Sequence, residues 1–404
     1  MITGFAVAGF ERLTVDIVFD HGVAKLPIWL LAFAPGVGLA IATLWLRIPA
    51  RGLSPATADE YLESFHDGKA LTVRDLVHRG VAAVATLGTG GALGLEGPSI
   101  YLGATIGATL QRRFRRIFEG ADPNLLLVAG AAAGIAAIFK APATGAVFAL
   151  EVPYQDDLAR RMLLPALVAA ASGYVALVAV NGTTALFPIA GTPPLSFVDL
   201  AAAAALGLTA GIGARCFAWL LQLSKRIASY PKYSALRVIS AGGCIAALFA
   251  IGRGLTGESL VLTPGYGVVQ WALDPKRGLA LLAAILVLRC LATSAAVAGG
   301  GVGGLFVPLV VSGALLGRMF GDVIGHDTSL FLVVGIAAFL GAGYRVPLAA
   351  VMFVAETTGR PGFIVPGLIA AVVAELVMGQ ASVTSHQKPS APGVAFDDTE
   401  PEDP

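Results

Sequence analysis

The stretch Gly94-Leu95-Glu96-Gly97-Pro98 has a counterpart 210 residues later, Gly304-Leu305-Phe306-Val307-Pro308. Each copy continues with two further glycines, so that the pattern G-x3-P-x4-G-x3-G occurs twice. Glycine permits unusual backbone angles, and proline suits the first turn of a helix. We therefore expect irregular backbone in each copy, followed by a helix that begins at Pro98 or Pro308.

A second pair of matching segments follows in the same order. Lys140-Ala141-Pro142 precedes Glu151, and Arg345-Val346-Pro347 precedes Glu356, with these positions offset by 205 residues. Two repeats in one order predict two structurally related halves, residues 1–180 and 197–388. A linker over residues 181–196 joins them. The Pro-rich and acidic tail over residues 389–404 is expected to be disordered.

The composition indicates an all-α integral membrane protein. The chain has 404 residues, of which 56% are hydrophobic and only 13% charged, and its mean hydropathy is +0.79. A soluble domain carries more charge than this, whereas a helix needs about 20 mostly apolar residues to cross a bilayer. Apolar segments suited to this role are Leu26–Leu46, Leu163–Val180, Phe197–Leu221, Val238–Ile251, Gly278–Val297 and Phe363–Met378.

Several classes of function are excluded or disfavoured by the same composition. The net charge of +1 offers no nucleic-acid footprint, and the five histidines show no metal-ligand spacing. The glycine-rich loops lack the surrounding strand pattern and the GK[ST] sequence of a nucleotide site, so we expect no cofactor and no enzymatic activity. Cys216, Cys244 and Cys290 lie in apolar segments, and we expect them to be buried free thiols.

Broken helices at membrane depth favour an anion site. Irregular backbone survives there only where it lines a cavity or is buried in protein, and the start of a helix presents unpaired N–H groups and a positive dipole end. Besides the starts near Pro98 and Pro308, a third candidate is Arg51–Pro55, which opens a helix expected over Pro55–Phe65. A scaffold without transport leaves these paired starts unexplained.

Glu96 is the carboxylate that we expect to function. It stands alone in an apolar, glycine-rich stretch, and ionisable groups at membrane depth are costly and usually functional. Its charge is suited to occupy the anion site until protonation releases it. Glu151 and Glu356 end apolar helices, and we interpret them as structural. Lys140 and Arg345 either pair with carboxylates or raise the local anion concentration.

These residues together resemble the CLC chloride channels and transporters over nearly the whole chain. Gly94–Pro98 is similar to the family's G-[K/R]-E-G-P motif, and Gly303–Pro308 to its G-x-F-x-P motif. The resemblance implies two inverted-topology repeats of tilted, broken helices, and a homodimer with one pore per subunit in the plasma or inner membrane. It implies gating by Glu96. The anion-binding positions that it and the helix starts suggest are Gly52, Ser54, Gly94, Leu95, Gly97, Gly304, Leu305, Phe306 and Val307.

The chain departs from the family pattern at several positions. Gly52 stands where the family has an anion-binding serine, with Ser54 two residues on, and Leu95 replaces the usual basic residue. No tyrosine lies near Val383, where the family closes the inner side of the pore. The inner proton-transfer glutamate of the antiporters is Val152 here.

The leading hypothesis from the sequence is therefore a passive or weakly coupled chloride channel gated by Glu96. The alternative is a chloride/proton antiporter with another proton route. A transporter selective for fluoride or nitrate is a lesser alternative. The expected partners are chloride, membrane lipid and a second copy of the chain.

Overall fold

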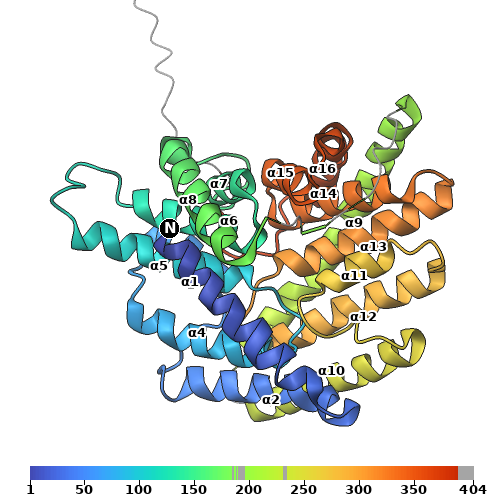
Figure 1. Cartoon of the computed structure of the whole chain (residues 1–404), viewed down its shortest axis with the longest axis horizontal. Coiled ribbons are helices and arrows are strands. Elements are labelled where there is room, and N and C mark those ends of the chain that lie inside the picture. Colours follow the sequence, from blue (N-terminus) through green and yellow to red (C-terminus); the bar gives the residue numbers. More distant parts are fainter. Residues whose placement is uncertain (184–185, 188, 190–195, 231–233, 390–404) are drawn as a thin grey trace, which may run out of the picture.

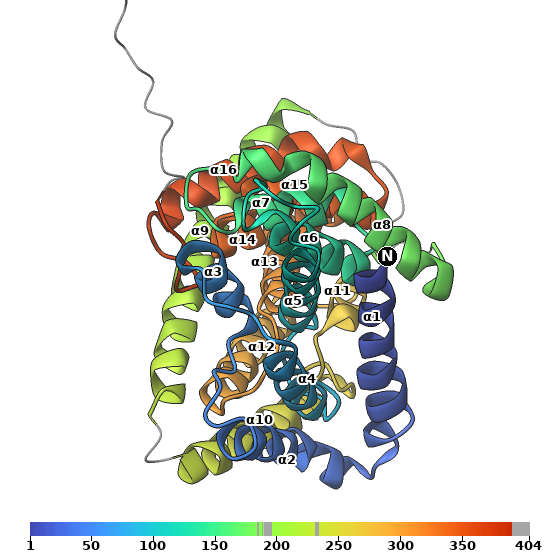
Figure 2. The same ribbon diagram turned by 90° about the vertical axis from the view of Figure 1, so that its left-hand side faces the viewer.

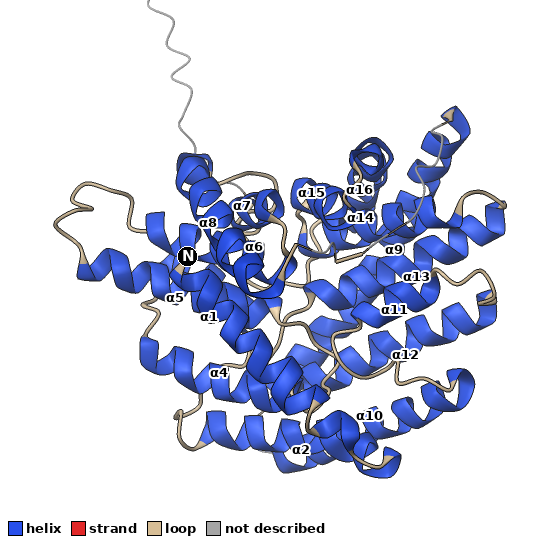
Figure 3. Cartoon of the chain, in the orientation of Figure 1, coloured by secondary structure: helices blue, strands red, loops and turns tan. Residues whose placement is uncertain are grey.

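The computed structural model describes residues 1–183, 186–187, 189, 196–230 and 234–389. The middle of the predicted linker, and residues 390–404 of the predicted disordered tail, therefore lie outside the described residues. The described part of the chain is helical and contains isolated bridges but no β-strand (Figure 3).

The first half of the chain contains eight α-helices and a π-helical segment that continues the first of them. They are α1 (Ile2–Glu11), the π-helix (Arg12–Asp20), α2 (Ile28–Arg47), α3 (Thr57–Asp67), α4 (Val73–Leu87), α5 (Glu96–Arg113), α6 (Leu125–Phe139), α7 (Pro142–Glu151) and α8 (Leu163–Asn181).

The second half repeats this order in its described residues. Its helices are α9 (Phe197–Ala228), α10 (Ser234–Thr256), α11 (Tyr266–Ala272), α12 (Leu279–Ala298), α13 (Phe306–Ile324), α14 (Thr328–Tyr344), α15 (Pro347–Thr358) and α16 (Ile364–Met378). In Figure 1 the first half lies mainly to the left and the second half mainly to the right, and α2 packs beside α10 along the lower edge, as Figure 2 also shows.

Seven segments of the described chain are long and apolar enough to cross a membrane, which makes this a multi-pass membrane protein. They are Ile28–Arg47, Arg160–Asn181, Phe197–Ala228, Ser234–Thr256, Leu279–Ala298, Phe306–Ile324 and Pro361–Met378. Large apolar side chains such as Leu164, Ile239 and Leu376 are exposed on them. Such a surface requires apolar surroundings, which the interior of a membrane provides.

Glu151 and Glu356 hold the two halves together reciprocally. Glu151, at the end of α7, accepts hydrogen bonds from the amides of Leu348 and Ala349 in the first turn of α15, at 3.1 and 2.8 Å. Glu356 accepts from the two matching amides at the start of α7, at 2.8 and 2.7 Å. Contacts that are exchanged in this way are the signature of a two-fold relation. The predicted structural role of both glutamates is confirmed.

Glycines allow the closest helix crossings, and these crossings also occur twice. Gly103 on α5 crosses Gly130 on α6, and a Cβ on Gly103 would overlap the Gly130 carbonyl oxygen. Gly313 on α13 meets Gly335 on α14 in the same way. Small residues at a crossing let two backbones approach, which is how helices associate strongly in lipid.

The helix starts predicted from the sequence each differ from the observed starts by two residues. Helices α5 and α13 begin at Glu96 and Phe306, two residues before the prolines. Helix α3 spans Thr57–Asp67 instead of Pro55–Phe65. The first four N–H groups of any helix lack an intrahelical partner, so proline is tolerated anywhere in the first turn, as in α5 and α13. Pro55 instead precedes the N-cap residue of α3, Ala56, and lies outside that helix.

The expected burial of the cysteines was wrong for two of the three. Cys216 and Cys244 are exposed, Cys290 is partly buried, and all three are free thiols. An apolar segment of a membrane protein has one face toward lipid, so its apolar character does not imply burial within the protein.

We predict that Gly103→Ala destabilises the protein by about 2 kcal/mol, because the added methyl group forces α5 and α6 apart. Gly243→Ala is the matched control, since Gly243 on α10 has no neighbouring heavy atom within 4 Å of an added Cβ. The control should be neutral or slightly stabilising, because alanine favours helix. Thermal unfolding in detergent measures both, and equal melting temperatures would contradict the prediction.

Candidate anion-binding site

The two glycine-rich breaks meet at the centre of the molecule. The Gly94 amide donates to the Gly304 carbonyl at 2.9 Å, and the Gly304 amide donates to the Gly94 carbonyl at 2.7 Å. These residues are equivalent in the two repeats, so the contact is again reciprocal. Helices α5 and α13 both begin within two residues of this bridge, and their first turns therefore lie next to each other.

The Glu96 carboxylate occupies the space between the two breaks. It is fully buried, and one of its oxygens accepts a hydrogen bond from the Phe306 amide at 2.5 Å. A Cβ on Gly94 or Gly304 would overlap the carboxylate, so glycine at both positions makes room for it.

The second Glu96 oxygen, Oε2, is buried and has no hydrogen-bond partner among the described residues. The carboxyl group is thus held by a main-chain donor at the start of α13, and helix N-termini are places that bind anions. The side chain therefore occupies a place that suits a small anion.

Tyr344 contributes a hydroxyl that the sequence analysis missed. Its ring is buried at the end of α14, and its hydroxyl oxygen lies 3.4 Å from the Leu305 amide, from which it accepts. Val383, the position where a hydroxyl was sought, is buried and has none. The hydroxyl retains its own proton, so it can donate to an anion beside Leu305.

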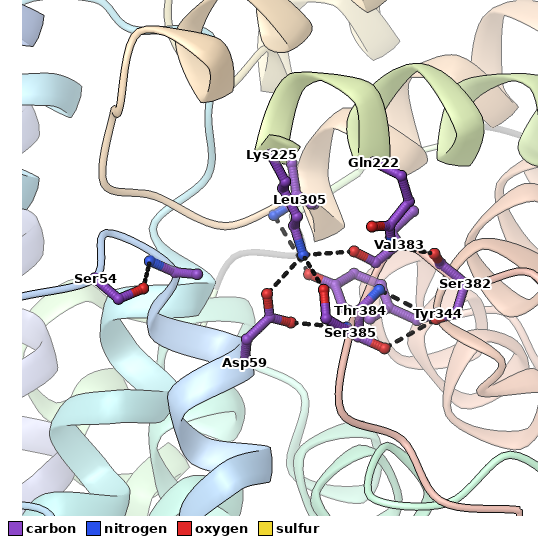
Figure 4. Close-up of polar contacts among 11 residues, drawn as sticks. Ser54, Asp59, Gln222, Lys225, Leu305, Tyr344, Ser382, Val383, Thr384 and Ser385 are labelled. Atoms are coloured by element: carbon purple, nitrogen blue, oxygen red, sulfur yellow. Dashed lines mark hydrogen bonds and ion pairs between the residues drawn. The ribbon is translucent and has the colours of Figure 1, made fainter. Parts of the chain in front are cut away.

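A cavity of about 440 Å³ reaches this point from one side of the molecule. Leu305, Gly304 and Tyr344 line its inner end, and Gly52 and Ser54 line its wall in the first half of the chain. The Ser54 hydroxyl accepts from the Ala56 amide at 3.2 Å (Figure 4) and keeps its proton for donation.

An aromatic cluster fixes the position of Phe306. Its ring lies 4.4 Å from the Phe139 ring and 4.9 Å from the Phe353 ring, measured between centroids. Tyr344 packs on the same ring at 6.3 Å. These neighbours come from both halves, so the amide that binds Glu96 is held by packing on both sides.

The structure brings together most of the predicted site. Glu96, Gly94, Gly304 and Phe306 lie in contact, and a Cβ on Gly97 would come within 3.1 Å of the Gly304 Cα. The remaining predicted positions are placed as follows: Leu305 and Val307 beside Phe306, Gly52 and Ser54 in the cavity wall, and Leu95 as the buried residue that precedes α5.

Leu95 and Val152 do not line the cavity. The Leu95 carbonyl accepts from the Ser99 amide and hydroxyl within α5, at 3.0 and 2.9 Å. Val152 is buried beyond the end of α7, and its carbonyl accepts from the Gln387 side chain at 3.0 Å. The same Gln387 nitrogen donates to the Tyr344 carbonyl at 2.8 Å, so the Gln387 side chain bridges the main chains of Val152 and Tyr344.

Arg345 pairs with carboxylates, which was one of the two roles predicted for it. Its guanidinium lies 2.7 Å from Asp156 and 3.6 Å from Glu375 on α16. Lys140 donates to the Asn181 carbonyl at 3.4 Å. Neither residue lines the cavity.

A family model, two sequence relatives and a solved structure that resemble this chain agree with one another. The family model described as voltage gated chloride channel matches residues 36–379. The chain is 27% identical to the H(+)/Cl(-) exchange transporter ClcA of Vibrio cholerae serotype O1, over 88% of this chain and 78% of that protein. It is 26% identical to the voltage-gated ClC-type chloride channel ClcB of Citrobacter koseri, over 96% of each. A crystal structure of a CLC-type fluoride/proton antiporter shares the fold, with a TM-score of 0.80, 22% identity and 96% coverage of each chain.

We predict that Tyr344→Phe weakens anion binding by about 1 kcal/mol, the usual contribution of one hydrogen bond. The ring and its packing are retained, so only the hydroxyl is tested. Isothermal titration of detergent-solubilised protein with chloride measures the change. Tyr174→Phe on α8, away from the cavity, is the control, and equal affinities of the two variants would contradict the prediction.

Proposed function

Because this chain belongs to the voltage-gated chloride channel family, we propose that it carries chloride across the cell membrane in exchange for protons. The sequence alone favoured a passive channel. Exchange is now the better supported of the two, since a relative is named as an H(+)/Cl(-) exchanger and a protein of the same fold as a proton antiporter. The channel stays as the alternative, supported by the name of the Citrobacter relative.

The position of Glu96 carries the proposal. Its carboxylate accepts from the Phe306 amide, and an anion that took the same donor would displace it. A protonated carboxyl group is a weaker acceptor and bears no charge, so protonation favours its departure and the entry of the anion. Proton binding and anion binding at this one place are therefore linked, which is the requirement for exchange.

A proton also needs an acceptor on the other side of the site, and Val152 cannot serve. We assign this role to Glu375 on α16. One of its oxygens is buried without a partner among the described residues, and the other is 3.6 Å from the Arg345 guanidinium. Carboxylates within membrane helices commonly belong to proton relays.

The charged residues around Glu375 extend from the protein surface toward the candidate anion-binding site. Asp156, which pairs with the same guanidinium, has a side chain that is 68% exposed, whereas the side chain of Glu375 is 18% exposed. Glu375 also lies within electrostatic range of Glu151, the residue before Val152. Arg345 follows Tyr344 directly, so this cluster is joined to the candidate anion site by one peptide bond.

Chloride is the proposed substrate because both relatives are named for it. Fluoride is the second candidate, since the fluoride/proton antiporter shares the fold. We place the protein in the plasma or inner membrane as a homodimer. The exposed apolar side chains of α8 and α16, among them Leu164 and Leu376, offer a surface for the second copy.

We predict that Glu96→Gln abolishes proton movement, while chloride flux continues and loses its pH dependence, because the amide imitates the permanently protonated carboxyl group. Chloride efflux from proteoliposomes with simultaneous pH recording measures both ions. Glu258→Gln, at an exposed glutamate, is the control. A Glu96→Gln variant with the wild-type pH response would remove Glu96 from the mechanism.

We predict that Glu375→Gln lowers proton transport by about tenfold or more and leaves chloride flux largely intact, since the variant preserves shape but cannot carry a proton. The same recording gives the ratio of protons to chloride. An unchanged ratio would show that another group accepts the proton. Wild-type vesicles that move chloride and no protons would establish the passive channel instead.

A further inference from the structure

Lys225 extends from α9 into the cavity that leads to Leu305. Its Nζ lies 2.6 Å from a carboxylate oxygen of Asp59 on α3, 2.8 Å from the Val383 carbonyl oxygen and 3.5 Å from the Ser385 hydroxyl (Figure 4). The Ser385 amide donates to the other Asp59 oxygen at 3.1 Å. An ion pair thus joins the two halves of the chain across the cavity.

The cavity has a simple charge pattern. Of the described residues that line it, Lys225 is the one with a cationic side chain and Asp59 the one with an anionic side chain. Their side chains are 20% and 12% exposed, so both remain in contact with the cavity. The other polar groups that the described lining offers are neutral. They include the Tyr344 hydroxyl, which accepts from the Leu305 amide, and the Thr57 hydroxyl, which has no hydrogen-bond partner among the described residues.

An ammonium group in a cavity with low-dielectric walls concentrates anions, because the walls focus its field. The Asp59 carboxylate opposes this effect, since it neutralises the same charge. An ammonium has three donor hydrogens. When an anion replaces Asp59 on one of them, the bond to the Val383 carbonyl still holds Lys225 in position.

We propose that Lys225 captures a small monovalent anion in this cavity, and that Asp59 competes for the same ammonium group and thereby limits how tightly the anion is held. The inference rests on the proposed anion transport and adds a loading site to it. Neither residue belongs to the glycine-rich breaks or to the surroundings of Glu96.

A purely structural role makes a different prediction. The segment Ser382–Ser385 is held by Lys225 through the Val383 carbonyl and by Gln222 through the Ser382 carbonyl, at 3.0 Å. If Lys225 and Asp59 serve only to clamp this segment, substitution of either loosens it, and both variants change transport in the same direction. A capture site requires opposite changes.

The experiment measures initial chloride flux from proteoliposomes as a function of chloride concentration. Lys225→Met should raise the apparent KM for chloride by about threefold or more, Asp59→Asn should lower it, and Lys225→Arg should stay near wild type. Both shifts should shrink when an impermeant salt raises the ionic strength from about 0.03 to about 0.3 M, because the Debye length falls severalfold. Lys69→Met, which removes a cation outside the cavity lining, is the matched control.

Two results would overturn the capture site: shifts of KM in one direction for Lys225→Met and Asp59→Asn, or no shift in either variant while wild-type flux is normal. If Lys225→Met fails to fold, the fall in KM for Asp59→Asn and its sensitivity to salt carry the test. Wild-type vesicles without chloride flux would overturn the proposed function itself, which separates the two failures.

Discussion

The paired hydrogen bonds between Gly94 and Gly304 are the constraint on which the rest of the structure depends. Two helices are interrupted inside the protein, and each interruption leaves main-chain groups that lipid cannot satisfy, at a cost of several kcal/mol per group. The two breaks satisfy each other at this bridge. The Phe306 amide, two residues further on in the second half, donates to Glu96, and the absence of side chains at both glycines gives its carboxylate space.

The reciprocal contacts around this bridge explain why the two halves must meet as they do. Glu151 and Glu356 each accept hydrogen bonds from the first turn of a helix in the opposite half. Each half therefore depends on the other for hydrogen-bond acceptors at these helix starts. The Phe306 ring is packed by residues from both halves. A site formed at such a junction is sensitive to small movements between the halves, which suits a protein that must release what it binds.

The charges are distributed along this junction in a way that fits the movement of anions. At the central position the Phe306 amide donates to the Glu96 carboxyl group, and beside it the Leu305 amide donates to the Tyr344 hydroxyl. The lysine in the cavity is paired with Asp59, and in the proposed capture site this pairing lets the approach attract anions without retaining them permanently. Conduction and exchange both need sites that bind weakly enough to release the ion.

The sequence by itself determined the membrane-spanning character, the two repeats and the interrupted helices, and it singled out Glu96 as the carboxylate at one of the breaks, because apolar length, glycine-proline spacing and a lone carboxylate are local features. It displaced each helix start by two residues, since a proline can stand within the first turn, as in α5 and α13, or just before the helix, as in α3. Only the tertiary structure brought Tyr344 to Leu305 and Lys225 to Asp59, and it alone showed that Cys216 and Cys244 are exposed. These contacts and exposures depend on which face of one helix packs against a second helix that is distant in the sequence. A local sequence pattern does not determine this packing.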